Sequence, residues 1–487
     1  MTGLSKSKLL AHRQCPKRLW LETYRPELAE VDAGTAARFA VGEDVGGIAR
    51  DLHAGGLLIE GETLRDVLAL TRQALQQKPR RPLFEATLEH DKVLVRADLL
   101  LPAARGYRLV EVKSSTRVKG VHYPDAAVQA WVLRGTGLKL ARVEVAHINT
   151  SFEYPGNGDY NGLLTYVDVT PETDELSAEV PAWVAAARKT LRQKNEPNIE
   201  PGEQCSDPYD CPFIGHCAPE TLEAADGYPP EILPYGGKLP GKLREEGYDD
   251  LRHVPRDRLD KPLHQRIWQA SVTGKAFLNP QVKAVLQAYP YPRYFFDFET
   301  IQYAVPIWAG TRPYQQIPFQ WSCHREDKNG ALKAEAFLST DAGDPRRACA
   351  ESLLKALGTK GPIFTYNAQF ERGRIAELAA AFPDLKSSLD QVHARIVDLL
   401  PIAREHYYHP DMRGSWSIKK VLPTVAPDLS YDDLAVGDGG MAQEAYSEMI
   451  DPGTSAVQRE ELRAALLEYC GQDTLALVRL SRFFEGR

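Results

Sequence analysis

The chain has 487 residues, of which 43 % are hydrophobic and 26 % are charged, and its formal net charge is -7. This composition is typical of a globular protein of two or three domains, and its apolar runs are too short to cross a bilayer. The start Met1-Thr2-Gly3-Leu4 lacks the apolar core of a signal peptide, so we expect a cytoplasmic protein without membrane contact. The net charge excludes a uniformly basic surface but not nucleic acid as a substrate, because nucleases confine their basic groups to a groove.

The first part of the chain predicts an α/β core with one sheet. Helices are expected over residues 5–25, with an interruption at Pro16, and over 31–54 and 60–77; strands follow over 83–88, 93–101 and 108–113, then a helix over 124–133, a strand over 141–148 and a helix over 179–193. The three consecutive strands predict a meander. An order of helices, meander, helix and strand is typical of an α/β domain.

From residue 224 the composition changes. Pro229-Pro230, Gly236-Gly237 and Pro240 predict a linker over residues 224–290. Within it, residues 243–251 and 263–270 predict a small helical module, either a plain helical spacer or one that resembles a helix-hairpin-helix. A second α/β domain is expected over residues 291–487. Its predicted strands cover 294–300, 317–323, 334–339 and 362–366, and its predicted helices cover 345–357, 369–382 and 455–484.

The strand residues Asp98, Glu111 and Lys113 form the first candidate site. Side chains alternate along a strand, so Glu111 and Lys113 share a face while Val110 and Val112 point away from it. The two carboxylates suit a hard divalent cation, and the lysine suits the attacking water or the scissile phosphate. A surface hairpin with exposed charges is the alternative, since so short a motif has many false positives.

Asp98, Glu111-Val112-Lys113 and Gln129 on the following helix resemble the PD-(D/E)xK nuclease superfamily, especially its RecB-type members. Glu85, on the preceding strand, matches a further acid of that group. The resemblance implies a restriction-endonuclease-like fold over residues 1–223, with Asp98 and Glu111 as metal ligands. Many relatives carry a metal-binding histidine where this chain has Gly46-Gly47, which implies a single metal or a weakly held second one.

The seven cysteines are an odd number in a chain for which no export signal is expected, so a disulfide framework is not expected. Cys15 precedes the first site, and Cys205, Cys211 and Cys217 follow it closely spaced. This arrangement resembles the iron–sulfur nucleases of the RecB and AddB kind and the CRISPR-adaptation nucleases, and it implies a structural [4Fe–4S] cluster. Zinc bound by four thiolates and four unrelated thiols are the alternatives.

The remaining cysteines are expected to be small buried hydrophobic residues. They are Cys323, Cys349 and Cys470.

A second candidate site lies on the strand Tyr294-Phe295-Phe296-Asp297-Phe298-Glu299, where two acids share one face. Burying them is unfavourable unless a positive group such as a metal neutralises them. The segment resembles the first motif of DEDD-type 3′–5′ exonucleases, which have an RNase H-like fold. Glu371 falls in their second motif, where aspartate is usual, and Tyr469 and Asp473 match the tyrosine version of their last motif. Tyr469 at i and Asp473 at i+4 share a helix face, so the tyrosine could orient the attacking water.

As a whole the chain is similar to a bacterial family of such fusions, whose C-terminal part is a domain of unknown function. We therefore expect a Mg²⁺- or Mn²⁺-dependent deoxyribonuclease, an exonuclease acting on DNA ends or single strands in repair or defence. The alternatives are a nucleic-acid-binding or assembly protein with one or both sites inactive, and an RNA-processing exonuclease. DNA is favoured over RNA, although no motif reads the 2′-hydroxyl, and the sequence identifies no protein partner.

Overall fold

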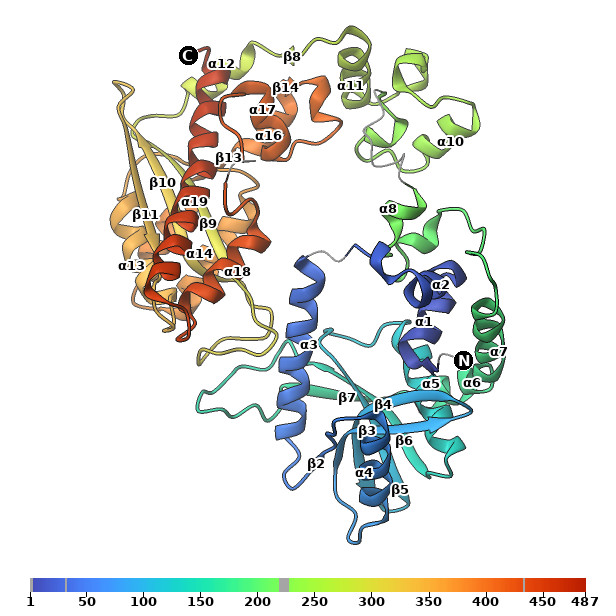
Figure 1. Cartoon of the computed structure of the whole chain (residues 1–487). Helices are drawn as coiled ribbons and strands as arrows, with labels where there is room; N and C mark the ends of the chain where they lie inside the picture. Colours follow the sequence, from blue (N-terminus) through green and yellow to red (C-terminus); the bar gives the residue numbers. More distant parts are fainter. Residues whose placement is uncertain (1–2, 31–32, 219–226, 432–433) are drawn as a thin grey trace. The chain divides into compact units, whose positions relative to one another are not determined.

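The protein is a mixed α/β protein with two mixed sheets and flanking helices. The computed structural model describes residues 3–30, 33–218, 227–431 and 434–487. The chain divides into two compact units, the first of residues 1–224 and 303–314 and the second of residues 225–302 and 315–487 (Figure 1). The predicted boundary at residues 223–224 and the predicted helix start at residue 31 lie outside the described residues. In the described part, no helix is long and apolar enough to cross a membrane.

The first unit is built on a seven-stranded sheet of order β2-β3-β4-β5-β6-β7, with β1 paired to β4. Its strands are β1 (Leu4–Ser5), β2 (Leu57–Leu58), β3 (Leu83–His90), β4 (Val93–Ala103), β5 (Gly106–Lys113), β6 (Leu140–Ile148) and β7 (Leu164–Asp168). The predicted meander is confirmed, because β3, β4 and β5 pair antiparallel in sequence order. The next pair, β5 and β6, is parallel, and the chain between them crosses the sheet as a helix.

The helices of the first unit are α1 (Lys6–Gln14), α2 (Pro16–Tyr24), α3 (Ala33–Asp51), α4 (Leu64–Gln76), α5 (His122–Gly135), α6 (Thr170–Ser177), α7 (Val180–Leu191) and α8 (Ile214–Cys217). The predicted interruption at Pro16 is confirmed, since Cys15 is extended between α1 and α2. Helix α5 has small buried side chains at Ala126, Ala127 and Ala130, so it can pack closely against β3, β4 and β6. Its polar residues Asp125 and Gln129 are buried with it.

The second unit contains a five-stranded sheet of order β11-β10-β9-β12-β13, with β9 at its centre. Its strands are β9 (Arg293–Ile301), β10 (Ile317–Glu326), β11 (Leu332–Leu338), β12 (Ile363–Thr365) and β13 (Ile396–Asp398), and a separate pair joins β8 (Phe277–Leu278) to β14 (Tyr407–Tyr408). Strand β9 runs antiparallel to β10 and parallel to β12. It is buried over nearly its whole length, which explains its run of aromatic residues.

The helices of the second unit are α10 (Leu239–Glu245), α11 (Pro262–Thr273), α12 (Gln281–Gln287), α13 (Arg346–Leu357), α14 (Gln369–Ala381), α15 (Lys386–Ala394), α16 (Leu399–His406), α17 (Ile418–Val425), α18 (Gly439–Ile450) and α19 (Ala456–Glu485). The hydroxyl of Ser455 caps α19 at its N-terminus. This long helix contacts β9, β10 and β11 and follows the sheet in Figure 1. It therefore places its buried face against the central strand.

The segment with the composition of a linker is folded into the second unit. Leu243, Leu251, Ile267 and Leu286 are fully buried and belong to the same hydrophobic cluster as Phe295 of β9. The prolines and glycines set turns between short helices rather than an extended tether. Short helices are present in this segment. Helix α10 covers residues 239–245 where a helix was expected over 243–251, and α11 covers 262–273 where one was expected over 263–270.

The connection between β9 and β10 was not anticipated as a distinct feature. Its residues 303–314 belong to the first unit, although both flanking strands belong to the second. The Tyr154 amide donates to the Thr311 carbonyl at 2.9 Å, and the Gly310 amide donates to the Tyr154 carbonyl at 2.8 Å. The Tyr314 hydroxyl donates to the carbonyl of Ser114, the residue after Lys113. The loop thus lies beside the end of β5.

Candidate active sites

The first site forms where β4 and β5 separate. Their ladder ends at the pair Leu99 and Val110, and beyond it the Asp98 side chain takes the place of a backbone acceptor. Asp98 Oδ2 accepts a hydrogen bond of 2.7 Å from the Val112 amide. The separation contributes to a cavity of about 810 Å³, whose lining includes Asp98, Glu111 and Lys113.

Glu111 is the centre of this site and is almost fully buried. Its Oε1 accepts hydrogen bonds from the ammonium groups of Lys113 at 2.6 Å and Lys6 at 2.9 Å. Its Oε2 accepts from the side-chain amide of Gln129. The structure therefore brings Glu111, Lys113 and Gln129 into direct contact.

Two residues of this cluster were missed from the sequence. The Lys6 ammonium, at the start of α1, lies 2.8 Å from Asp125 Oδ1 as well as 2.9 Å from Glu111. Asp125 also accepts from Lys113 at 2.6 Å. Asp125 precedes Gln129 by one helical turn, so helical spacing could have identified it. Lys6 lies far upstream in the sequence, and no local pattern indicates its position.

The carboxyl groups of the first site differ in protonation. Burial and the neighbouring Glu111 carboxylate raise the pKa of Asp98 to about 8, although the lysines oppose this. Burial also acts to raise the pKa of Glu111, but Lys113 and Lys6 outweigh it and hold that pKa below its ordinary value. A divalent cation beside Asp98 would take the place of its proton.

Glu85 lines the same cavity but makes its own contacts. It lies in β3 with a positive φ of 56°, at a break in the pairing between Phe84 and Ala86. Its carboxylate oxygens lie 3.6 Å from Arg50 and 3.3 Å from Arg96. Glu85 therefore holds two arginines at the cavity, a role that differs from that of Asp98 and Glu111.

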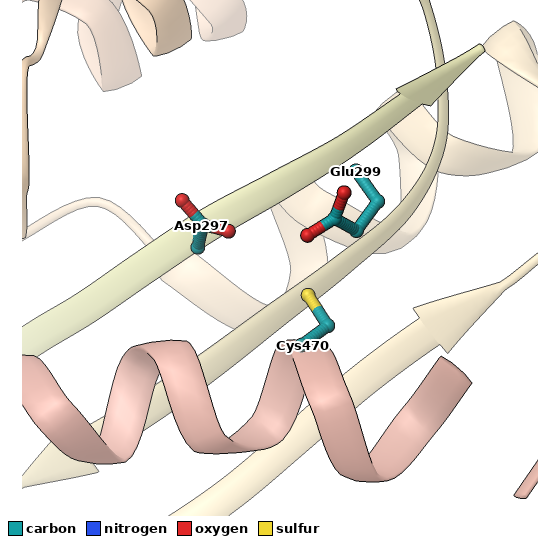
Figure 2. A group of neighbouring side chains, drawn as sticks. All are labelled: Asp297, Glu299 and Cys470. Carbon is teal, nitrogen blue, oxygen red and sulfur yellow. The ribbon is translucent and has the colours of Figure 1, made fainter. Parts of the chain in front are cut away.

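The second site lies between β9 and α19. Ligand atoms of Asp297, Glu299 and Cys470 all lie within 4.8 Å of one another (Figure 2). The two acids are on one face of β9, and the cysteine comes from the facing helix. Cys470 was expected to be a buried hydrophobic residue, and it is buried, but its thiol faces the two carboxyl groups.

Asp473 joins this group one turn further along α19. The Tyr431 hydroxyl donates to Asp473 Oδ1 at 2.6 Å. The Lys419 ammonium lies 5.5 Å from the ring centre of Tyr431 and 5.8 Å from that of Tyr469. Tyr431 was not among the predicted site residues, and together with Lys419 it supplies the polar and positive groups beside Asp473 and Tyr469.

The pKa values of the acids of the second site are all raised above their ordinary values. Burial and the Asp473 carboxylate raise the pKa of Glu299 to about 8, and burial raises that of Asp473 to about 6. Burial and Asp473 also hold the pKa of Asp297 well above its usual range. Burial raises the pKa of Glu371 to about 8, and within the described residues its Oε2 has no hydrogen-bond partner. Such a group of buried acids is suited to a divalent cation.

The four predicted cysteine ligands line a single pocket. Cys15 lies at the junction of α1 and α2, and Cys205 ends the 3-10 helix Glu203–Cys205. Cys211 lies in the loop before α8, and Cys217 is the last residue of α8. The Cys211 amide donates to the Cys205 carbonyl at 2.8 Å. Across the described part of the chain, no three of these Sγ atoms lie within 4.8 Å of one another.

The fold and its side chains define a mixed α/β protein with two acidic sites and a four-cysteine pocket. A family model described as a domain of unknown function (DUF2779) matches residues 294–417, the part that carries Asp297, Glu299 and Glu371. The chain is 24 % identical over 222 residues to an uncharacterized protein of Mycoplasma pneumoniae, covering 42 % of this chain and 33 % of the relative. It is 22 % identical over 294 residues to one of Ureaplasma parvum, covering 54 % and 41 %. The chain thus spans a third to two fifths of these relatives' lengths.

Proposed function

We propose that the protein is a metal-dependent nuclease with two active sites, one in each unit. The observation that carries the proposal is that buried carboxyl groups from separate elements meet at both sites. In each site a lysine interacts with them, Lys113 in the first and Lys419 in the second. The first site is that of a PD-(D/E)xK nuclease of the RecB type. The second is that of a DEDD-type exonuclease with an RNase H-like fold.

In the first site, Asp98 and Glu111 would hold Mg²⁺ or Mn²⁺, and their buried oxygens fit this group. The cation supplies a more acidic water and charge stabilisation for the phosphate. Lys113 orients the attacking water or binds the scissile phosphate. Gln129 fixes the orientation of Glu111 through its amide hydrogen bond.

In the second site, Asp297, Glu299 and Asp473 would hold the cation, and the orphaned oxygen of Glu371 is available to it or to its water. Tyr469 orients the attacking water from the next turn of α19. Tyr431 fixes Asp473 through its hydroxyl. Asp398, at the end of β13, is structural, because its two oxygens accept from the amides of Asn367 and Ala368.

The four-cysteine pocket is the proposed site of a [4Fe–4S] cluster, and zinc bound by four thiolates is the alternative. In support, all four cysteines line one pocket, and four thiolates are what such a cluster requires. The cluster would tie α1 and α2 to the loops around Cys205 and to α8.

The proposed substrate is DNA, at ends or in single strands. RNA is the second candidate, because neither site contains a group that identifies the sugar. A binding or assembly protein with inactive sites is the remaining alternative. The raised pKa values of the acids favour active sites, because a role in binding alone does not require buried unpaired carboxyl groups.

End-labelled single-stranded DNA and RNA of the same sequence test the proposal. Lys113→Ala should abolish cleavage by the first site and Asp297→Ala cleavage by the second, each by at least about 100-fold. The exposed residues Lys194 and Asp257 provide matched controls as Lys194→Ala and Asp257→Ala. Cleavage that survives the double variant unchanged would show that neither site is active.

A further inference from the structure

Cys470 occupies a position that apolar packing does not explain. It is fully buried on α19, and its thiol, with the carboxyl groups of Asp297 and Glu299, forms a group whose ligand atoms lie within 4.8 Å of one another (Figure 2). Asp473 follows three residues later, so it shares a helix face with Cys470. Two acids of β9 therefore lie beside this thiol, and Asp473 follows one turn further along the helix.

The other buried cysteines differ from it. Cys349 lies on α13 and Cys323 on β10, and both belong to a hydrophobic cluster with Phe296 and Leu353. Within the described ranges, Cys470 is the one cysteine that joins carboxyl groups in a potential metal site. A buried cysteine is ordinarily a small hydrophobic residue, but an apolar role does not place the sulfur against two acids.

A second observation also indicates a cation site here. Glu371 is 1 % exposed, and among the described residues its Oε2 has no hydrogen-bond partner. The Glu371 and Asp297 carboxyl groups interact directly, so the Glu371 carboxyl belongs to the same group of acids. An unpaired buried carboxyl oxygen is costly unless a cation or its water occupies the site.

We propose that Cys470 is a ligand of the second-site metal, together with Asp297 and Glu299, and that this site takes a thiophilic divalent cation. A site of oxygen ligands alone suits Mg²⁺ and Mn²⁺, whereas one sulfur ligand shifts preference toward softer cations such as Co²⁺, Zn²⁺ or Cd²⁺. On binding, the thiol releases its proton to solvent and the sulfur lone pair forms the bond to the metal. The inference rests on the proposed function in that it adds a ligand to that function's second metal site.

Cadmium titration of the full-length protein tests the ligand directly. The wild type and Cys470→Ser are compared as purified, so that the four-cysteine pocket is in the same state in both. Cys470→Ser should bind Cd²⁺ more weakly at this site and should lose the ultraviolet absorption of one cadmium–thiolate bond. Cys349→Ser, which removes another buried thiol, should retain the wild-type affinity and absorption. Equal affinity and absorption in wild type and Cys470→Ser would overturn the proposal.

A second measurement requires no variant. Cadmium-113 nuclear magnetic resonance of the wild type should show a resonance from mixed sulfur and oxygen ligation, distinct from that of a four-thiolate site. Its absence would overturn the proposal even if Cys470→Ser failed to fold.

The two proposals can fail separately. If Cd²⁺ binds through Cys470 but Asp297→Ala leaves cleavage unchanged, the metal site stands and the second nuclease activity fails. If cleavage depends on Asp297 but Cys470→Ser leaves Cd²⁺ binding and its absorption unchanged, the inference alone fails.

Discussion

Replacing Glu299 with glutamine should stabilise the protein at neutral pH when no divalent cation is present. The variant removes one buried acid from the second site and keeps the size and hydrogen-bonding shape of the side chain. Burial and the Asp473 carboxylate raise the pKa of Glu299 from 4.5 to about 8. The folded protein therefore binds this proton more tightly than the unfolded chain does.

The sign and size of the effect follow from this difference. Between pH 4.5 and about 8 the folded state holds more protons than the unfolded state, so the free energy of unfolding falls as the pH rises. Each unit of pKa difference corresponds to about 1.4 kcal/mol, so the loss at pH 7 reaches at most about 3 kcal/mol. Glutamine does not ionise and avoids this loss. At pH 5 the wild type and Glu299→Gln should differ by less than about 1 kcal/mol.

The effect is measured by urea unfolding of the 487-residue chain in EDTA at pH 5 and at pH 7, with circular dichroism as the signal. The control is Glu468→Gln, an exposed residue of the same helix, which should leave both values unchanged. Adding Mn²⁺ at pH 7 should stabilise the wild type more than Glu299→Gln, because the variant lacks a ligand. A stability gain of the same size at pH 5 and pH 7 would refute the reasoning, since it would not depend on ionisation.

Three further predictions concern the remaining groups. The Lys6 ammonium contacts Glu111 and Asp125, so in protein whose second site is inactivated Lys6→Ala should lower kcat of DNA cleavage by about 100-fold. Lys6→Arg should recover part of this loss, and the control Lys8→Ala should leave kcat unchanged. Equal loss in both alanine variants would indicate a general effect on α1. Cys205→Ser should yield protein without the brown colour of an iron–sulfur cluster, and a colourless wild type containing zinc, isolated without oxygen, would contradict the cluster. Tyr431→Phe removes a hydrogen bond that lowers the pKa of Asp473, so the pH profile of second-site cleavage should move to higher pH. An unshifted profile would show that this hydrogen bond does not set the pKa of Asp473.

Local sequence spacing was sufficient to predict which residues of each site lie together on one strand. Glu111 and Lys113 share a strand face because they are two residues apart, and the same argument applies to Asp297 and Glu299. Their strands were predictable from alternation and from aromatic and β-branched residues. The meander followed from the short turns between the three strands.

Groups that reach a site from a distant part of the chain could not be predicted in this way. Lys6 lies 105 residues before Glu111, and Tyr431 lies 42 residues before Asp473. Both are ordinary polar residues in their own segments, and only tertiary packing brings them to the acids. The same holds for residues 303–314, whose Tyr314 bonds to Ser114 across 200 positions.

Several helices were missed for a different reason. Helix α17 contains Pro423 and α18 begins at Gly439-Gly440, so residues that normally end helices lie within or at the start of these two. Helix α18 is nevertheless secured by Asp438, whose side chain accepts from the Gly440 and Met441 amides. Tertiary burial of Val421 and Leu422 has the same effect for α17. Packing and capping outweigh local propensity here.

Helix α1 connects two features that the sequence presents separately. Lys6 is its first residue and contacts Glu111, while Cys15 follows its last residue and lines the cysteine pocket. A helix of nine residues is a rigid rod of about 14 Å, so the position of one end fixes the position of the other. If the cysteine pocket holds a cluster, that cluster therefore fixes where the Lys6 ammonium lies. In the proposed nuclease, a group with no direct part in hydrolysis would still determine the charge beside the central carboxylate.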